Sequence, residues 1–362
     1  MKKKIAFLLP LCVLLAAAVW AFAAGDAGDP LASLSYLNGT FSSLVDSRVD
    51  ERLDASDQAL LQGAEGGTLA APDAAAWAET RLKQGDALSG VTGTNVMLLA
   101  GSAQVTYSSG TVVDATTGSV AASGSVLSAR HRYIVAEDTS ASFTVTSKTA
   151  VVDYQGSDSF AYSDAVDYNA MAAALKTLHL FKGSFTGYGE GFDLEAAPTR
   201  LQALIMFIRV LGEEEQALAW TGAMPFTDVA RGSDAEKYVG YAYDMGYTNG
   251  YSATQFKPAG AVNAYQYTEF VLRAMGYSSA ANTNLADTFD RALEAGVLTA
   301  GEVSMLRTDK FLRAELVYIS YYALDAVLPD GSRTLGDLLC DKGVFTSWER
   351  ADAGALVTSW RL

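Results

Sequence analysis

The sequence is poor in the residues that build disulfides, metal centres and nucleophilic catalytic sites. Of its 362 residues only two are cysteines, Cys12 and Cys340, and two are histidines, His131 and His179. Cys12 falls in an amino-terminal apolar stretch that we expect to be removed, which leaves Cys340 without an intramolecular partner. A zinc site or a Cys–His pair needs more of these side chains close together. We therefore expect no metal site, no cofactor and no catalytic residues.

Positive charge is also scarce. The chain carries 26 lysines and arginines against 41 aspartates and glutamates, a formal net charge of −15. Such a field repels nucleic acid, which we exclude as a partner. An anionic ligand would need a local cationic or helix-terminal site instead. Acidic residues are plentiful enough for the carboxylate pair of a glycosidase, but no spacing singles out such a pair.

Long apolar runs are confined to the amino terminus. Residues 1–24 combine basic Lys2–Lys4 with an apolar centre from Ile5 to Trp20 and small residues around Ala21–Ala23, the layout of a secretory signal peptide. No later run reaches about 18 residues, so we expect no membrane span once the signal is removed. The pattern predicts an exported protein.

The amino-terminal half predicts one helix and then a small β domain. Between Leu34 and Leu61 apolar residues recur at helical spacing, and we assign residues 25–90 to this helix and a Gly/Ala-rich linker. The helix packs on a neighbouring domain or, alternatively, contacts another chain. Residues 91–156 form a small all-β domain of about six strands separated by turn residues. The expected strands are Val96–Leu99, Gln104–Tyr107, Val112–Val113, Tyr133–Ala136, Phe143–Thr146 and Ala150–Tyr154.

An internal repeat organises the carboxy-terminal half. An offset of 64 residues carries Thr199 to Asn263, Gln202 to Gln266, Arg209 to Arg273 and Gly212 to Gly276. The cap residue and the glutamine three positions later predict a capping box in each copy, and the glycine falls where a helix should end. We expect each copy to contain a helix, a glycine-closed turn, an extended loop and a second helix.

Four motifs in this region resemble the S-layer homology (SLH) repeat. They are Phe226-Thr227-Asp228-Val229, the turn from Gly246 to Gly250, Phe256-Lys257-Pro258 and Thr199-Arg200-Leu201-Gln202. A weaker third copy contains Ala295-Gly296-Val297-Leu298 and Leu312-Arg313-Ala314-Glu315. The resemblance implies three repeats, at residues 165–212, 224–278 and 285–345, with a terminal extension at 346–362. The expected fold class is multidomain α+β: an amino-terminal helix, a small all-β domain and an all-α pseudo-trimer of three SLH repeats.

The resemblance to SLH repeats also implies a binding site. Such families hold a pyruvylated, anionic secondary cell-wall polysaccharide in grooves between repeats, with the motif arginine prominent. The matching residues are Arg200 and Arg313, with Gln202 and Glu315 as their capping partners. Each arginine starts a helix, whose unpaired amides and positive dipole would favour an acid group. Ala264 stands where the second repeat should carry its arginine.

Three further residues are candidates for the same grooves. The family places an aspartate like Asp228 near the groove, although an aspartate before a helix is often only a cap. Gly183 and Gly250 close the turns, where glycine supplies backbone angles that other residues resist.

The resulting hypothesis is an exported, non-catalytic surface protein that is anchored to the cell wall. Its partners would be the secondary cell-wall polysaccharide and peptidoglycan of a Gram-positive-type envelope. Two alternatives stay open. One is a self-assembling structural protein of the S-layer type, and the other is a wall-attached glycoside hydrolase that uses the SLH repeats as its anchor.

Overall fold

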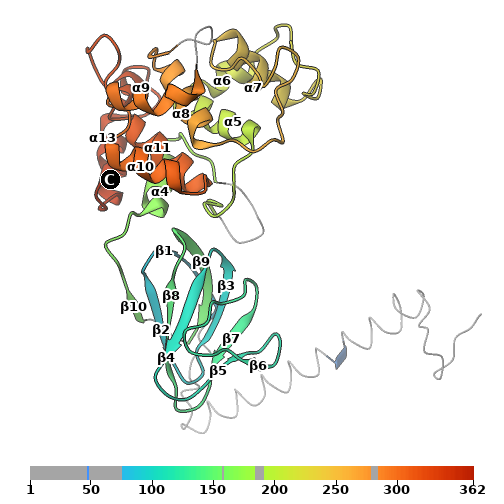
Figure 1. Ribbon diagram of the computed structural model, residues 1–362, viewed down its shortest axis with the longest axis vertical. Helices are drawn as coiled ribbons and strands as arrows, with labels where there is room; N and C mark the ends of the chain where they lie inside the picture. The colour runs from blue at the N-terminus through green and yellow to red at the C-terminus, as the bar shows by residue number, and fades with distance from the viewer. Residues whose placement is uncertain (1–46, 49–75, 157–158, 184–190, 279–283) are drawn as a thin grey trace, which may run out of the picture. The chain divides into compact units, whose positions relative to one another are not determined.

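The computed structural model describes residues 47–48, 76–156, 159–183, 191–278 and 284–362. A β region precedes a helical region along the chain, so the α+β class is confirmed at that level (Figure 1). The predicted signal peptide lies outside the described residues, as does the amino-terminal helix apart from Ser47 and Arg48, which are helical. None of the helices in the described part is long and apolar enough to cross a membrane.

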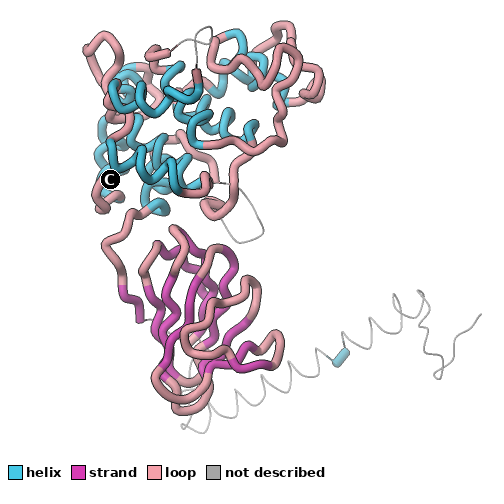
Figure 2. The backbone as a smooth tube through the Cα atoms, in the orientation of Figure 1, coloured by secondary structure: helices cyan, strands magenta, loops and turns pink. Residues whose placement is uncertain are grey.

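The β region consists of two antiparallel sheets, and all its strands belong to the second of two compact units, Ala75–Leu362. The strands are β1 (Ala78–Lys83), β2 (Ala87–Val91), β3 (Asn95–Ala100), β4 (Ala103–Tyr107), β5 (Val112–Asp114), β6 (Ser119–Val120), β7 (Arg132–Val135), β8 (Ser140–Val145), β9 (Thr149–Gln155) and β10 (Ser159–Ala161). One sheet has the order β1-β9-β3-β7-β5-β6 and the other β10-β2-β8-β4. Figure 2 shows these strands grouped apart from the helices.

A single apolar core joins the two sheets. Leu88, Val105 and Phe143 come from one sheet and Val96 and Val152 from the other, and all five are buried in one cluster. Buried residues alternate along strands such as β4 and β8, as a half-buried strand requires. The two sheets therefore form a sandwich.

All six predicted strand runs overlap strands of this sandwich, but the predicted domain boundary at residue 91 is wrong. The sheets begin at Ala78 and end at Ala161. Strands β1 and β2 each contribute only one large buried apolar residue, Leu82 and Leu88. A period-two pattern is weak with so few apolar positions, and pairing with the more apolar strands β9 and β8 holds β1 and β2 in place.

The helical region follows from Tyr168 onward. Its helices are α4 (Tyr168–Thr177), α5 (Arg200–Val210), α6 (Glu214–Leu218), α7 (Asp234–Asp244), α8 (Ala264–Ala274), the 3-10 helix η3 (Leu285–Asp287), α9 (Thr288–Glu294), α10 (Ala300–Thr308), α11 (Arg313–Ala323), α12 (Leu335–Asp341) and α13 (Ser347–Leu356). Both predicted capping boxes are present, at Thr199 and at Asn263. Gly212 and Gly276 follow the helix ends with φ of 67° and 86°.

Three central helices, α5, α8 and α11, contact one another in pairs. Each also packs on a helix that begins the neighbouring segment: α5 on α7, α8 on α9, and α11 on α4. Phe207, Tyr267 and Tyr318, one from each central helix, are fully buried. Because α11 packs on α4, the last central helix closes back on the first segment. Helix α13, in the predicted terminal extension, packs on α4 as well.

Candidate functional site

The first turn of α5 is docked on a distant loop through its backbone. The amide of Arg200 donates to the carbonyl of Gly260 at 2.8 Å, and the amide of Leu201 donates to that of Pro258 at 3.1 Å. The next amide, of Gln202, donates to the Thr199 hydroxyl at 3.2 Å. The amides of this helix start are therefore already paired within the protein.

The first turn of α11 docks in the same way on the loop that precedes α5. The amide of Arg313 donates to the carbonyl of Ala196 at 2.9 Å, and that of Ala314 donates to Leu194 at 3.1 Å. Leu194 and Ala196 are the positions that correspond, at the offset of 64, to Pro258 and Gly260. The expectation that unpaired helix amides hold a ligand is therefore wrong, because these amides join one segment to the next. Any recognition must come from side chains.

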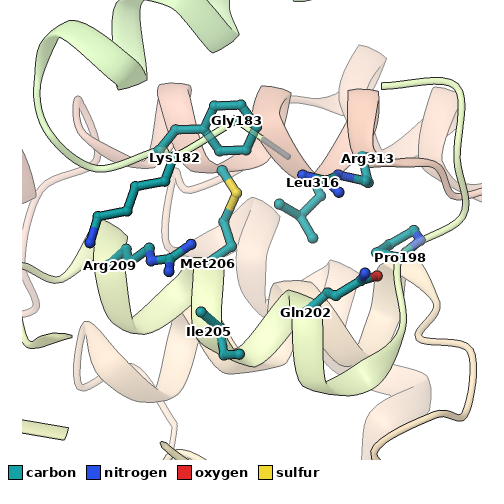
Figure 3. Close-up of a pocket in the computed structure, with 10 residues that line it drawn as sticks. Lys182, Gly183, Pro198, Gln202, Ile205, Met206, Arg209, Arg313 and Leu316 are labelled. Carbon is teal, nitrogen blue, oxygen red and sulfur yellow. The ribbon is translucent and has the colours of Figure 1, made fainter. Parts of the chain in front are cut away.

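One cavity, of about 190 Å³, lies beside the start of α11, and we call it the Arg313 groove (Figure 3). It is lined by Phe181, Lys182, Gly183, Pro198, Gln202, Ile205, Met206, Arg209, Arg313 and Leu316. Every ionisable residue in this lining is basic. In Figure 3 the side-chain nitrogens of Lys182 and Arg209 lie together, with Met206 between them and the guanidinium of Arg313. An anion in this groove would meet cations from two sides over an apolar floor.

Two of these cations share one carboxylate. Glu214 accepts from Lys182 at 2.5 Å and from Arg209 at 2.8 Å, and the Tyr238 hydroxyl donates to it at 2.6 Å. Burial alone would raise the pKa of Glu214, but the hydrogen bonds from Lys182, Tyr238 and Arg209 lower it to about 2. Glu214 is therefore ionised at neutral pH, and it partly neutralises Lys182 and Arg209.

Arg313 is held from the opposite wall. Its side chain is 13% exposed, its guanidinium lies 3.6 Å from the Asp193 carboxylate, and it stacks 5.9 Å from the centre of the Phe181 ring. Burial lowers the pKa of Arg313, and the charges of Asp193 and Glu195 oppose that shift. The guanidinium is thus charged, largely desolvated and loosely balanced by acids.

A second cavity, of about 260 Å³, lies beside the start of α5, and we call it the Arg200 groove. Its lining is Arg200, Asn249, Gly250, Tyr251, Gln266, Glu269, Phe270, Arg273 and Leu285. Most of these positions correspond to those of the Arg313 groove: Gln266 to Gln202, Glu269 to Ile205, Phe270 to Met206, Arg273 to Arg209, and Asn249-Gly250 to Lys182-Gly183. In both grooves an arginine that starts one central helix faces the turn and the central helix of the next segment.

Arg200 is the most buried cation of either groove. Its residue is 7% exposed, and its Nη2 donates to the Gly250 carbonyl at 3.2 Å and to the Thr248 hydroxyl at 3.4 Å. The guanidinium lies 5.0 Å from the Phe256 ring centre and 5.5 Å from that of Phe270. Its Nε is buried without a hydrogen-bond partner among the described residues. These partners are all neutral.

Burial and the nearby charge of Arg273 lower the pKa of Arg200 to about 10, so it still carries its charge at pH 7. Arg273 is better balanced, because Glu269 accepts from its Nε at 2.9 Å. Glu269 is itself 1% exposed and also binds Arg291 at 2.5 Å. The Arg200 groove therefore contains one cation, Arg200, that is buried without an acidic partner in the described residues.

The structure divides the predicted site residues into two groups. Gln202 and Gly183 line the Arg313 groove and Gly250 lines the Arg200 groove, beside the two arginines. Asp228 instead accepts from the amides of Phe256 and Lys257 at 2.9 and 2.8 Å, and these bonds lower its pKa against the effect of burial. It holds the extended loop.

Glu315 also lies outside both cavity linings. It is fully buried, accepts from the amide of Leu312 at 2.6 Å and forms an ion pair with Lys148. Glu315 fixes the start of α11 and hence the position of Arg313. Arg209 and Arg273 line the grooves but were absent from the predicted site. Their signal was available, because the same offset of 64 residues relates them.

Comparison with known proteins identifies part of this region. Residues 225–263 match the model of the S-layer homology domain, which indicates cell-surface anchoring to cell-wall polymers. This match covers α7 and the loop that ends at the start of α8. No curated protein matches the chain. The described residues contain no group of three or more His, Cys, Asp or Glu side chains that could hold a metal ion.

Three solved structures are similar to about a quarter of the chain. The epimerase RmlC from Legionella pneumophila Philadelphia 1 is 22% identical over 23% of this chain and 48% of its own, with a TM-score of 0.17. Procruciferin, an 11S globulin from Brassica napus, is 16% identical over 24% and 21% (TM-score 0.16). Pumpkin pro-11S globulin is 9% identical over 28% of each chain (TM-score 0.15). This chain thus spans less than half of each.

Proposed function

We propose that residues 165–345 form three SLH repeats, and that the Arg313 and Arg200 grooves anchor an exported chain to an anionic cell-wall polysaccharide. The match at residues 225–263 supports one repeat directly. Equivalent backbone docking at Arg200 and Arg313 supports the same architecture on either side of it. The role is non-catalytic, and the β sandwich is carried by the anchor.

The arginine placed at the same corner of each groove is the observation on which this function rests. Arg200 and Arg313 both start a central helix, Arg200 is buried and Arg313 largely so, and both line a cavity large enough for one acidic sugar. A guanidinium offers a planar fork of donors that suits a carboxylate. A pyruvate acetal on a polysaccharide would present such a carboxylate. Aromatic and apolar residues beside it, Phe270 in one groove and Met206 in the other, would contact the sugar ring.

Sedimentation with purified wall sacculi tests this function. The full chain should sediment with sacculi that retain their polysaccharide and should stay in solution after acid extraction of that polymer. Added soluble polysaccharide should release the bound protein. Unchanged sedimentation with extracted sacculi would contradict the proposal and would place binding on peptidoglycan itself.

A further inference from the structure

The architecture contains a third place for a groove, between the start of α8 and the segment that contains α11. Superposing the turn before α10 and helix α11 on their equivalents in the Arg200 groove carries Asn249 to Thr299, Tyr251 to Gly301, Glu269 to Tyr318 and Arg273 to Tyr322. Ala264, which starts α8, takes the place of the arginine. We call this position the Ala264 groove; by the repeat alignment, Ala264, Thr299, Gly301, Tyr318 and Tyr322 are the equivalents of lining residues of the Arg200 groove.

The chain's own segment Ser359–Leu362 lies against these residues. The Thr299 hydroxyl donates to the Leu362 carbonyl at 2.5 Å, and the Leu362 amide donates to the Tyr318 hydroxyl at 3.0 Å. A side chain at Gly301 would meet Leu362 at 2.9 Å, so glycine leaves room for the segment. The guanidinium of Arg361 lies over the Tyr322 ring, 4.8 Å from its centre. One peptide thus contacts four residues, each of which is the counterpart of a residue that lines the Arg200 groove.

Arg361 fixes this segment through a buried acid. Its Nε donates to Glu302 at 2.6 Å and its Nη2 donates to the second oxygen of the same carboxylate at 3.0 Å. Glu302 is fully buried, and Arg361 Nη2 also donates to the Val297 carbonyl at 3.0 Å. A buried carboxylate needs such a partner, because leaving it unpaired is strongly destabilising. At the other end, Ser359 accepts from the amide of Asp167 at 3.1 Å.

We propose that Ser359–Leu362 is an intramolecular ligand that closes the Ala264 groove, so that the protein offers two polysaccharide sites. The number of two sites rests on the proposed function, which assigns polysaccharide binding to the Arg313 and Arg200 grooves. Two departures from the other grooves occur together here. The position that supplies arginine elsewhere is Ala264, and the space beside the equivalent turn and helix holds a peptide with its own arginine. A groove that already holds a segment of its own chain does not need an arginine to bind an acidic ligand.

Counting binding sites tests the closure. Isothermal titration with a pyruvylated monosaccharide should give two equivalents for the wild-type chain and two for Ala264→Arg, in which the segment still fills the groove. The double variant Ala264→Arg with Arg361→Gln should give three. Three equivalents for Ala264→Arg alone, or two for the double variant, would overturn the proposal. A wild-type chain that binds no sugar would refute the proposed function instead.

Amide exchange tests the occupied groove without any sugar. In the wild-type chain the Leu362 amide should exchange slowly, because it donates to the buried Tyr318 hydroxyl. Arg361→Gln should accelerate that exchange about ten-fold or more, since it removes a charge-assisted pair. Arg307→Gln is the matched control: Arg307 pairs with the exposed Asp290, so the Leu362 amide should be unaffected. Fast exchange already in the wild type, or equal exchange in the two variants, would refute a seated segment.

Discussion

Arg200→Gln tests whether a buried arginine is kept for a ligand. In the protein without ligand, Arg200 donates to two neutral oxygens and lies between the rings of Phe256 and Phe270. Glutamine retains a polar side chain of intermediate length but loses the charge. The substitution therefore removes the cation while leaving the walls of the groove in place.

The magnitudes predict a large effect on binding and a small one on stability. A pKa lowered from 12.5 to about 10 corresponds to a cost of roughly 3 kcal/mol for keeping the charge buried. Two neutral hydrogen bonds, at about 1 kcal/mol each, and ring contacts of about 1–2 kcal/mol offset most of that cost. Removing all of these together should change the free energy of unfolding by about 1 kcal/mol or less.

A bound carboxylate changes this balance. It would pair with the desolvated guanidinium of Arg200, and a hydrogen bond to a charged group contributes about 1.5–3 kcal/mol. Arg200→Gln should therefore weaken polymer binding roughly ten- to 150-fold. Arg313→Gln should weaken it less, because Asp193 already lies beside that guanidinium and two other cations line its groove.

Titration calorimetry with a pyruvylated monosaccharide and thermal unfolding of each variant measure the two effects separately. Arg231→Gln is the control, because Arg231 is 63% exposed, pairs with Glu236 and lines neither groove. It should bind and melt like the wild type. Wild-type affinity of Arg200→Gln, combined with a melting temperature several degrees lower, would refute the reasoning and make Arg200 a structural residue.

Three other perturbations address the rest of the site. Glu214→Gln should tighten binding in the Arg313 groove, because Lys182 and Arg209 lose the carboxylate that partly neutralises them. Because the pKa of Glu214 is lowered to about 2, this substitution should reduce stability fully above about pH 4.5, and the loss should disappear as the pH falls to about 2. Thermal unfolding measures this loss. In denaturant unfolding, Gly250→Ala should lower the free energy of unfolding by about 1–3 kcal/mol more than Gly246→Ala does. Both glycines have positive φ, but only a Cβ at position 250 would lie 2.2 Å from Phe226. Raising salt from 0.05 to about 0.5 M should weaken binding only modestly, since the grooves are partly buried.

Local signals in the sequence predicted much of the fold. Thr199 and Asn263 cap their helices through side-chain contacts three residues away, and such a pattern is readable without tertiary information. The runs of β-branched residues that form strands can also be recognised from local sequence alone. Strands β1 and β2 were missed because their place depends on partners far along the chain, such as Ala150 for Leu82 and Phe143 for Leu88.

The candidate site was predictable by residue type but not by mechanism. The repeat pattern drew attention to Arg200 and Arg313, and both line cavities. It did not show that their amides are paired with Gly260 and Ala196, since a docking loop some 60 to 120 residues away leaves no local signal. It also gave no sign that Arg313 and Lys182 line the same cavity, because that arrangement depends on how the segments close around the centre.

Backbone docking and groove chemistry are separable in this architecture. The bonds that join segments run from helix amides to loop carbonyls, so they place no demand on the side chains that line the grooves. Lining positions are accordingly free to differ: one such position is Ile205 in the Arg313 groove, Glu269 in the Arg200 groove and Tyr318 in the Ala264 groove. One fold thus accommodates two cavities with different linings, because the backbone bonds that hold the segments together do not involve the side chains that a ligand would touch.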